Sequence, residues 1–435
     1  MEACLTASPG PTVHSIPDSE WTRILDDDDE YGYINQYNLG APAIPATLPS
    51  NLVPQEVLNN SLSNVIKILY PFGDDNILNM IREGITVHEE LRAAVDLFSQ
   101  IYSKRRQVPL RQVLSDISFK GRVDGLQAAL MAAQAGRIAS SANDAMAALL
   151  VVSVFLLDGG QGAWSAFIDI ASAYVMAVLE DPRYHRNYRA AFQACNPKDE
   201  FIVKTTIWFD VIGSITMREH PRLLAAIREL FDPDQSFMSS SSMMSPMGCE
   251  RVVVWALAEA SNLSCWKRSS NRKGTLSQRE LVRKVEEIET HLERHAPLLQ
   301  PHPENPEWSR LLNSQIFRSA TKLFLQSIAN GNRPRVPEVR RCVDETFRYI
   351  VDTSIPNVAH NNSVFGIFLC GSLTDDPIKR HLLSLHLQKM EEAVGIGNAS
   401  TVLRLLQQQW ESRKRPPKAS VPWREQLKLA QVLLV

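Results

Sequence analysis

The segment AMAALLVVSVFLL, residues 145–157, is the most apolar run in the chain and lies between Asp144 and Asp158. Its 13 residues are too few to cross a bilayer, which takes about 20. We therefore predict a buried core helix. The turn DGGQG, residues 158–162, separates this run from AWSAFIDIASAYVMAVL, residues 163–179, which carries Asp169 in its middle. A glycine-rich turn between two such runs predicts a helical hairpin.

Outward from this hairpin, the pattern is helical nearly everywhere after residue 51. The segment SQRELVRKVEEIETHLERH, residues 277–295, opens with Ser277 and Glu280 at the spacing of a capping box. Its apolar residues recur every three or four positions and are Leu281, Val285, Ile288 and Leu292. A coiled-coil dimer would need a longer repeat, so packing into the protein's own core is favoured. We expect an all-α domain over residues 51–435, built as a multi-helix bundle of antiparallel helices.

Composition and cysteine spacing exclude several classes of protein. The 435 residues hold 46 Lys and Arg against 48 Asp and Glu, a formal net charge of −2, so a broad basic field for nucleic acid is absent. No two cysteines have the C-x₂-C spacing of a zinc site. Scattered cysteines predict reduced core thiols and an intracellular protein, and the N-terminus does not resemble a secretory signal. The cysteines are Cys4, Cys195, Cys249, Cys265, Cys342 and Cys370.

Residues 1–50 are rich in Pro, Gly and Ser, and we expect this segment to be largely disordered. Seven acids and one arginine between Asp18 and Glu30 give a charge of −6, which leaves +4 for the rest of the chain. Acids interleaved with apolar side chains are typical of an activation region, whose apolar residues enter a coactivator groove. The candidate residues are Trp21, Ile24, Leu25, Asp26, Asp27, Asp28, Asp29, Glu30 and Tyr31. A solvated linker fits the composition equally well.

Catalytic signatures are missing from the sequence. It contains no G-x-S-x-G elbow, no P-loop and no H-E-x-x-H zinc motif. We therefore predict no catalytic residue, no metal ligand and no cofactor, and we expect that the protein is not an enzyme.

A short basic stretch follows a predicted helix near the C-terminus and comprises Arg413, Lys414, Arg415 and Lys418. Two intervening prolines prevent the helix from continuing and leave the charges extended. Such a stretch is a candidate nuclear import signal. A solvated face, or cations that stabilise a helix C-terminus, are alternative interpretations.

Several segments taken together resemble the fungal-specific transcription factor domain, a helical region of many zinc binuclear cluster regulators, and they are most similar to its second type. The resemblance is carried by Trp208, Phe209 and Asp210, by MGC at 247–249, by FRSATKLFLQ at 317–326, by FGIFLCG at 365–371 and by residues 410–413. These motifs are packing signatures, with Asp210, Gly248, Gly371 and Trp410 as the family packing residues. The resemblance implies an all-α bundle that regulates transcription in a fungal nucleus.

The six cysteines are too dispersed to build the zinc cluster of that family. Either the protein acts without its own DNA contact, or an upstream segment is missing. We expect a nuclear transcriptional regulator of metabolic or biosynthetic genes, whose partners are coactivators or another DNA-binding regulator. A homodimer is left open, no membrane contact is expected, and direct DNA contact should be weak or absent. The alternative is a non-enzymatic helical scaffold or adaptor outside transcription.

Overall fold

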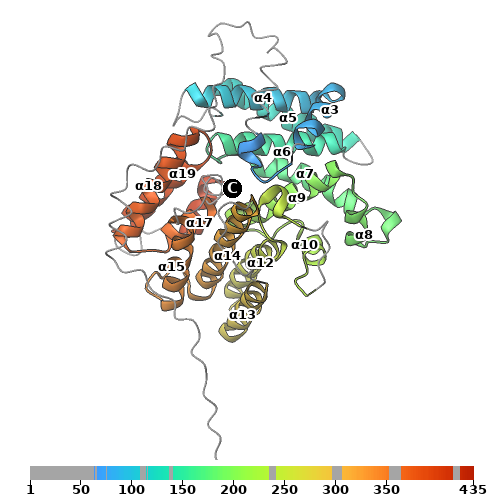
Figure 1. Ribbon diagram of the computed structural model, residues 1–435. Helices are drawn as coiled ribbons and strands as arrows, with labels where there is room; N and C mark the ends of the chain where they lie inside the picture. Colours follow the sequence, from blue (N-terminus) through green and yellow to red (C-terminus); the bar gives the residue numbers. More distant parts are fainter. Residues whose placement is uncertain are drawn as a thin grey trace, which may run out of the picture. The chain divides into compact units, whose positions relative to one another are not determined.

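The computed structural model describes residues 63, 66–74, 76–107, 114, 116–136, 141–234, 242–295, 306–351, 364–414 and 422–435. Every regular element within these ranges is a helix, so the predicted all-α class is confirmed (Figure 1). The helices in chain order are α3 (Asn76–Val87), α4 (Glu89–Gln107), α5 (Ile117–Gly136), α6 (Ala142–Leu157), α7 (Trp164–Leu179), η2 (Pro182–Tyr184), α8 (Tyr188–Gln193), α9 (Pro197–Met217), α10 (Leu224–Leu230), α11 (Met244–Met247), α12 (Arg251–Arg272), α13 (Gln278–Arg294), α14 (Pro306–Asn330), α15 (Pro337–Val351), α17 (Val364–Ser372), α18 (Pro377–Val394), α19 (Ala399–Arg413) and α20 (Trp423–Ala430).

The apolar run that opened the sequence forms α6, and every residue from Asp144 to Leu157 is buried. Helix α6 packs against α4, α7 and α9, and the turn after it leads directly into α7. The predicted core helix and helical hairpin are therefore confirmed. A capping box starts α6, because the Ser141 hydroxyl accepts from the Asp144 amide at 3.1 Å while the Asp144 carboxylate accepts from the Ser141 amide at 3.1 Å.

Helix α13 shows that the amphipathic pattern was interpreted correctly. Its buried residues are Leu281, Val285, Ile288 and Leu292, which are the four apolar residues of the predicted stripe. Ser277 caps the helix by accepting from the Glu280 amide at 3.2 Å. The stripe faces α12 and α14 of the same chain. Packing into the protein's own core, rather than a coiled-coil dimer, therefore accounts for these residues.

The segment 431–435 inserts between helices that lie far away in the sequence, and Val432, Leu433 and Leu434 are buried. The Leu433 amide donates to the Gly160 carbonyl at 2.8 Å, and the Trp164 indole donates to the Gln431 carbonyl at 2.7 Å. Thr216 at the end of α9 and Asn398 before α19 donate to the same segment at 2.7 and 2.8 Å. The turn of the helical hairpin is thereby tied to the last residues of the sequence.

Helices α12, α13 and α14 pack on one another, and α14 also contacts α15 and α17. Figure 1 shows α3 to α6 stacked at one end of this helical unit and α15, α18 and α19 along one side. Among the helices described, none combines the length and apolar character that a membrane span requires.

The contact between α17 and α19 yields a stability prediction. A Cβ on Gly371 would lie 2.8 Å from a methyl carbon of Leu406, so we expect Gly371→Ala to lower the free energy of unfolding by about 1–3 kcal/mol. Gly121 in α5 is a matched control, because nothing lies within 4 Å of its added Cβ. Gly121→Ala should raise the free energy of unfolding by about 0.5–1 kcal/mol through better helix propensity. Urea unfolding followed by circular dichroism measures both, and similar effects of the two variants would contradict the packing argument.

Candidate functional site

Three of the segments that carry the sequence resemblance meet in one aromatic cluster. Trp208 on α9 and Phe317 on α14 pack edge to face with ring centroids 4.8 Å apart. Phe365 on α17 stacks parallel to Phe317, with ring centroids 6.0 Å apart. Aromatic pairs in these geometries contribute about 0.5–1.5 kcal/mol beyond the area that they bury. The cluster therefore joins α9, α14 and α17 into one core.

Asp210 lies on α9, has no exposed surface, and holds the chain reversal before α10. Its carboxylate accepts from the Leu223 amide at 3.0 Å and from the Arg222 guanidinium at 3.2 Å. Arg222 also contacts Asp169 and donates to the Ser165 hydroxyl at 2.8 Å, and both of these partners lie on α7. Burial raises the pKa of Asp210, while the hydrogen bonds from Leu223 and Arg222 oppose that shift. Asp210 thus fixes α7, α9 and α10 relative to one another.

Gly248 ends α11 in the left-handed conformation, with φ of +60°. A side chain here would overlap the ring of Phe72, so both the backbone and the packing require glycine. The Asn313 amide on α14 donates to the carbonyls of Met247 and Gly248 at 3.2 and 2.9 Å. Cys249 next to it is buried, and burial raises the pKa of its thiol. A thiol held neutral in this way is a poor nucleophile.

Gly371 and Trp410 contact each other directly, because the Trp410 indole donates to the Gly371 carbonyl at 2.8 Å. Arg413, one turn further along, donates to the Ser372 carbonyl and to the Thr374 carbonyl, the latter at 3.2 Å. Cations that bind the last carbonyls of a helix stabilise its C-terminus. Burial lowers the pKa of Arg413. The closing tryptophan and arginine therefore cap the C-terminal end of α17.

The structure separates the members of the basic stretch. Arg413 is engaged with α17, whereas Lys414 is exposed and pairs with Glu411 at 2.6 Å. Arg415 and Lys418 lie outside the described residues, so the import signal stays a prediction. The same holds for the activation candidates between Trp21 and Tyr31, which also lie outside those ranges.

One group of potential metal ligands was not apparent from sequence spacing. Two of its members lie at the start of α4 and the third lies in the first turn of α6, far away in the sequence. Among the residues described, ligand atoms of His88, Glu90 and Asp144 lie within 4.8 Å of one another. His88 Nε2 is 3.0 Å from Asp144, and His88 Nδ1 accepts from the Leu91 amide at 3.2 Å. Both ring nitrogens are thus already engaged. The arrangement joins the N-terminal caps of α4 and α6. No sequence signal marks it, because histidine is not among the residues that usually cap helices.

A small apolar cavity of about 70 Å³ lies beside the aromatic cluster, with Trp208, Tyr70, Ser153 and Asn398 among its lining residues. The Tyr70 hydroxyl is 3.3 Å from that of Ser153, and burial raises the pKa of Tyr70 to about 12. A cavity that binds benzene measures about 150 Å³. This one is therefore too small for an aromatic ligand.

Comparison with known proteins matches residues 57–434 to the fungal specific transcription factor domain. The chain is 31% identical over 150 residues to the ustiloxin B cluster transcription factor ustR of Aspergillus flavus, which covers 32% of this chain and 25% of that protein. It is 26% identical over 238 residues to transcription factor ntnD of a Nectria species. This match covers 49% of this chain and 37% of that protein. This chain thus spans well under half of the length of these relatives. No solved structure matches it.

The contacts of Asp210 predict a large difference between two carboxylates that share Arg222. Asp210→Ala leaves the Leu223 amide and part of Arg222 without their buried partner. The free energy of unfolding should therefore fall by about 2–4 kcal/mol. Asp169 pairs with the same guanidinium but its side chain is 60% exposed, and Asp169→Ala should cost less than about 1 kcal/mol. Chemical denaturation of both variants provides the measurement. A loss of equal size in the two would show that Asp210 has no special role.

Proposed function

The chain belongs to the fungal specific transcription factor domain family, and on that premise we propose that it regulates transcription through contacts with other proteins. The match across residues 57–434 carries this proposal, and the relatives named as transcription factors support it. The contacts of Asp210, Gly248, Gly371 and Trp410 lie within the chain, which supports their interpretation as packing residues. We therefore place the regulatory contacts on surfaces and segments outside this core, and we assign no catalytic role.

The genes controlled by the chain belong to the same proposal. The relative from Aspergillus flavus is named for the ustiloxin B cluster, which favours biosynthetic genes as the targets here. Coactivators, or a second regulator that binds DNA, are the proposed partners. The alternative of a helical scaffold outside transcription predicts no change in transcript levels when the gene is deleted.

We predict that residues 1–50 activate a reporter when they are fused to a heterologous DNA-binding module. Replacement of Trp21, Leu25 and Tyr31 by alanine should lower reporter output about tenfold, because aromatic and aliphatic anchors dominate binding energy in such grooves. Replacement of Val13 and Ile44, apolar residues outside the acidic run, serves as the control and should have little effect. A fused segment that gives no signal above the module alone would support the linker interpretation.

We predict nuclear accumulation that depends on the members of the basic stretch other than Arg413. Arg413 caps α17, so its replacement would change the stability of the fold as well as nuclear import. The test variant therefore keeps Arg413 and combines Lys414→Ala, Arg415→Ala and Lys418→Ala. The ratio of nuclear to cytoplasmic fluorescence of a tagged chain should fall severalfold as the cluster of cations is lost. The control replaces Lys67, Arg82 and Lys120, which are exposed and dispersed. An unchanged ratio in the test variant would assign import to another segment.

A further inference from the structure

A second and larger cavity lies beside the C-terminal end of α17. It has a volume of about 500 Å³ and is bordered by the loop between α14 and α15, by the first turns of α15, and by the junction of α17 with α18. Sites for small molecules typically measure about 300–1,000 Å³. The charged residues that line this cavity are Arg335, Arg340, Asp344, Asp375, Asp376 and Lys379.

The three carboxylates of this cavity are already neutralised by neighbouring cations. Lys379 Nζ lies 2.9 Å from Asp376 and 3.3 Å from Asp344. Asp376 also caps α18 by accepting from the Ile378 amide at 2.8 Å. Asp375 pairs with Arg380 at 2.9 Å and with Arg413 at 3.3 Å. None of these acids is therefore left to balance a further cation.

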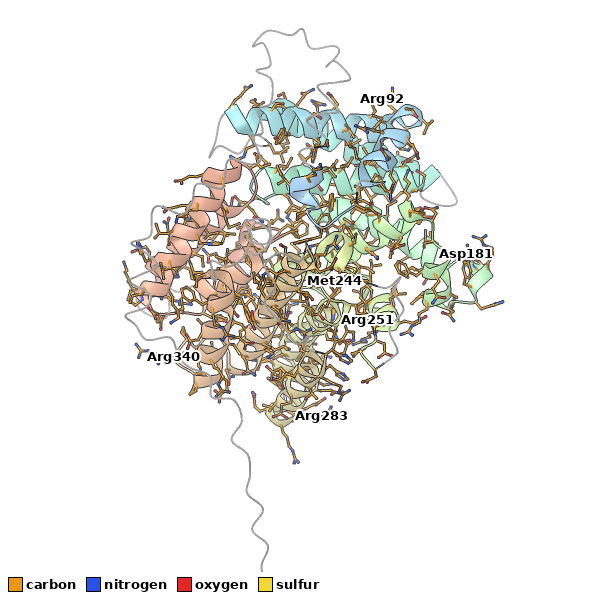
Figure 2. The ribbon with its side chains drawn as sticks, in the orientation of Figure 1. Arg92, Asp181, Met244, Arg251, Arg283 and Arg340 are labelled. Atoms are coloured by element: carbon orange, nitrogen blue, oxygen red, sulfur yellow. The ribbon has the colours of Figure 1, made fainter. Side chains whose placement is uncertain are left out.

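Arg335 and Arg340 form no ion pair with any carboxylate that the structure describes, and both are exposed. Arg340 projects from the surface of α15 in Figure 2. Three cations and three carboxylates line the cavity, and Arg380 and Arg413 pair with Asp375 from behind its wall. Helix α15 begins at Pro337, between the two arginines in sequence, and the partial positive charge of its N-terminus adds to theirs. Arg335 and Arg340 are thus the lining cations that have no described carboxylate as an ion-pair partner.

We propose that this cavity binds a small organic anion, whose carboxylate or phosphate group bridges the guanidinium groups of Arg335 and Arg340. A planar guanidinium donates two parallel hydrogen bonds to such a group, which gives both affinity and orientation. The neighbouring Arg333 and Arg341 are exposed but do not line the cavity. They strengthen the local positive potential and speed the approach of the anion.

The concave shape favours a small ligand over an extended polyanion such as duplex DNA. A phosphate backbone would use exposed arginines according to charge alone, so that Arg333 and Arg341 would count as much as Arg335 and Arg340. A ligand inside the cavity would depend only on the two that line it. This difference gives the test its internal control.

The experiment titrates the purified chain with inorganic phosphate, glycerol 3-phosphate and succinate at constant ionic strength, with glycerol as the uncharged probe. Isothermal titration calorimetry and thermal unfolding are the readouts. At least one anion should bind saturably and raise the melting temperature by a few degrees, because a ligand of the native state stabilises it. A preference for the phosphates or for succinate identifies which anionic group the cavity takes.

The arginine variants assign that binding to the cavity. Arg335→Gln and Arg340→Gln should each raise the dissociation constant about tenfold or more, because charge-assisted hydrogen bonds to the anion are lost. Arg333→Gln and Arg341→Gln, taken from the same loop and helix, should leave it within about twofold. The unliganded melting temperatures report whether all four variants fold.

Two results would overturn the proposal. One is the absence of saturable binding of any of the three anions up to about 20 mM, a concentration about twentyfold above the dissociation constant of a weak site, about 1 mM. The other is an equal loss in all four variants, with tighter binding of duplex DNA than of the small anions. Because the test uses the purified chain, its failure would leave the proposed role in transcription untouched, and the reporter results do not bear on it.

Discussion

Helix α6 has no polar face, and this constraint determines where the neighbouring helices pack. A helix that is apolar on all sides must be covered on all sides. Helices α4, α7 and α9 supply that cover. The segment 431–435, in which Val432, Leu433 and Leu434 are buried, is hydrogen bonded to the turn at the end of α6. The capping box of Ser141 and Asp144 satisfies the amides at its start, where a buried unpaired donor would be costly.

Local patterns predicted the elements better than they predicted the contacts between them. The stripe of α13 and the hairpin of α6 and α7 follow from periodicity and turn residues, which are local properties of the chain. The aromatic cluster of Trp208, Phe317 and Phe365 depends on how helices cross, and periodicity carries no information about that. For the same reason, neither the group around His88 nor the cavity lined by Arg335 and Asp375 could be predicted from the sequence.

Arg413 illustrates how a charge pattern can mislead. In the sequence it is one of four cations beside two prolines, a context that suggests exposure. In the structure it binds carbonyls at the end of α17, whereas its neighbour Lys414 is exposed. A long aliphatic stem lets an arginine lie along apolar surface while its head finds oxygen atoms. Sequence alone does not tell which member of a basic run finds such acceptors, because the acceptors belong to a distant helix.

The insertion of residues 431–435 has a consequence for the order of events during synthesis. The indole of Trp164 and its acceptor carbonyl are 267 residues apart. At about 5–20 residues per second, the ribosome needs on the order of tens of seconds to make that stretch. Throughout this interval, the apolar hairpin of α6 and α7 exists without its final covering segment. A nascent chain of this protein therefore leaves part of this apolar hairpin uncovered until residues 431–435 have emerged from the exit tunnel and can reach the Gly160 carbonyl and the Trp164 indole.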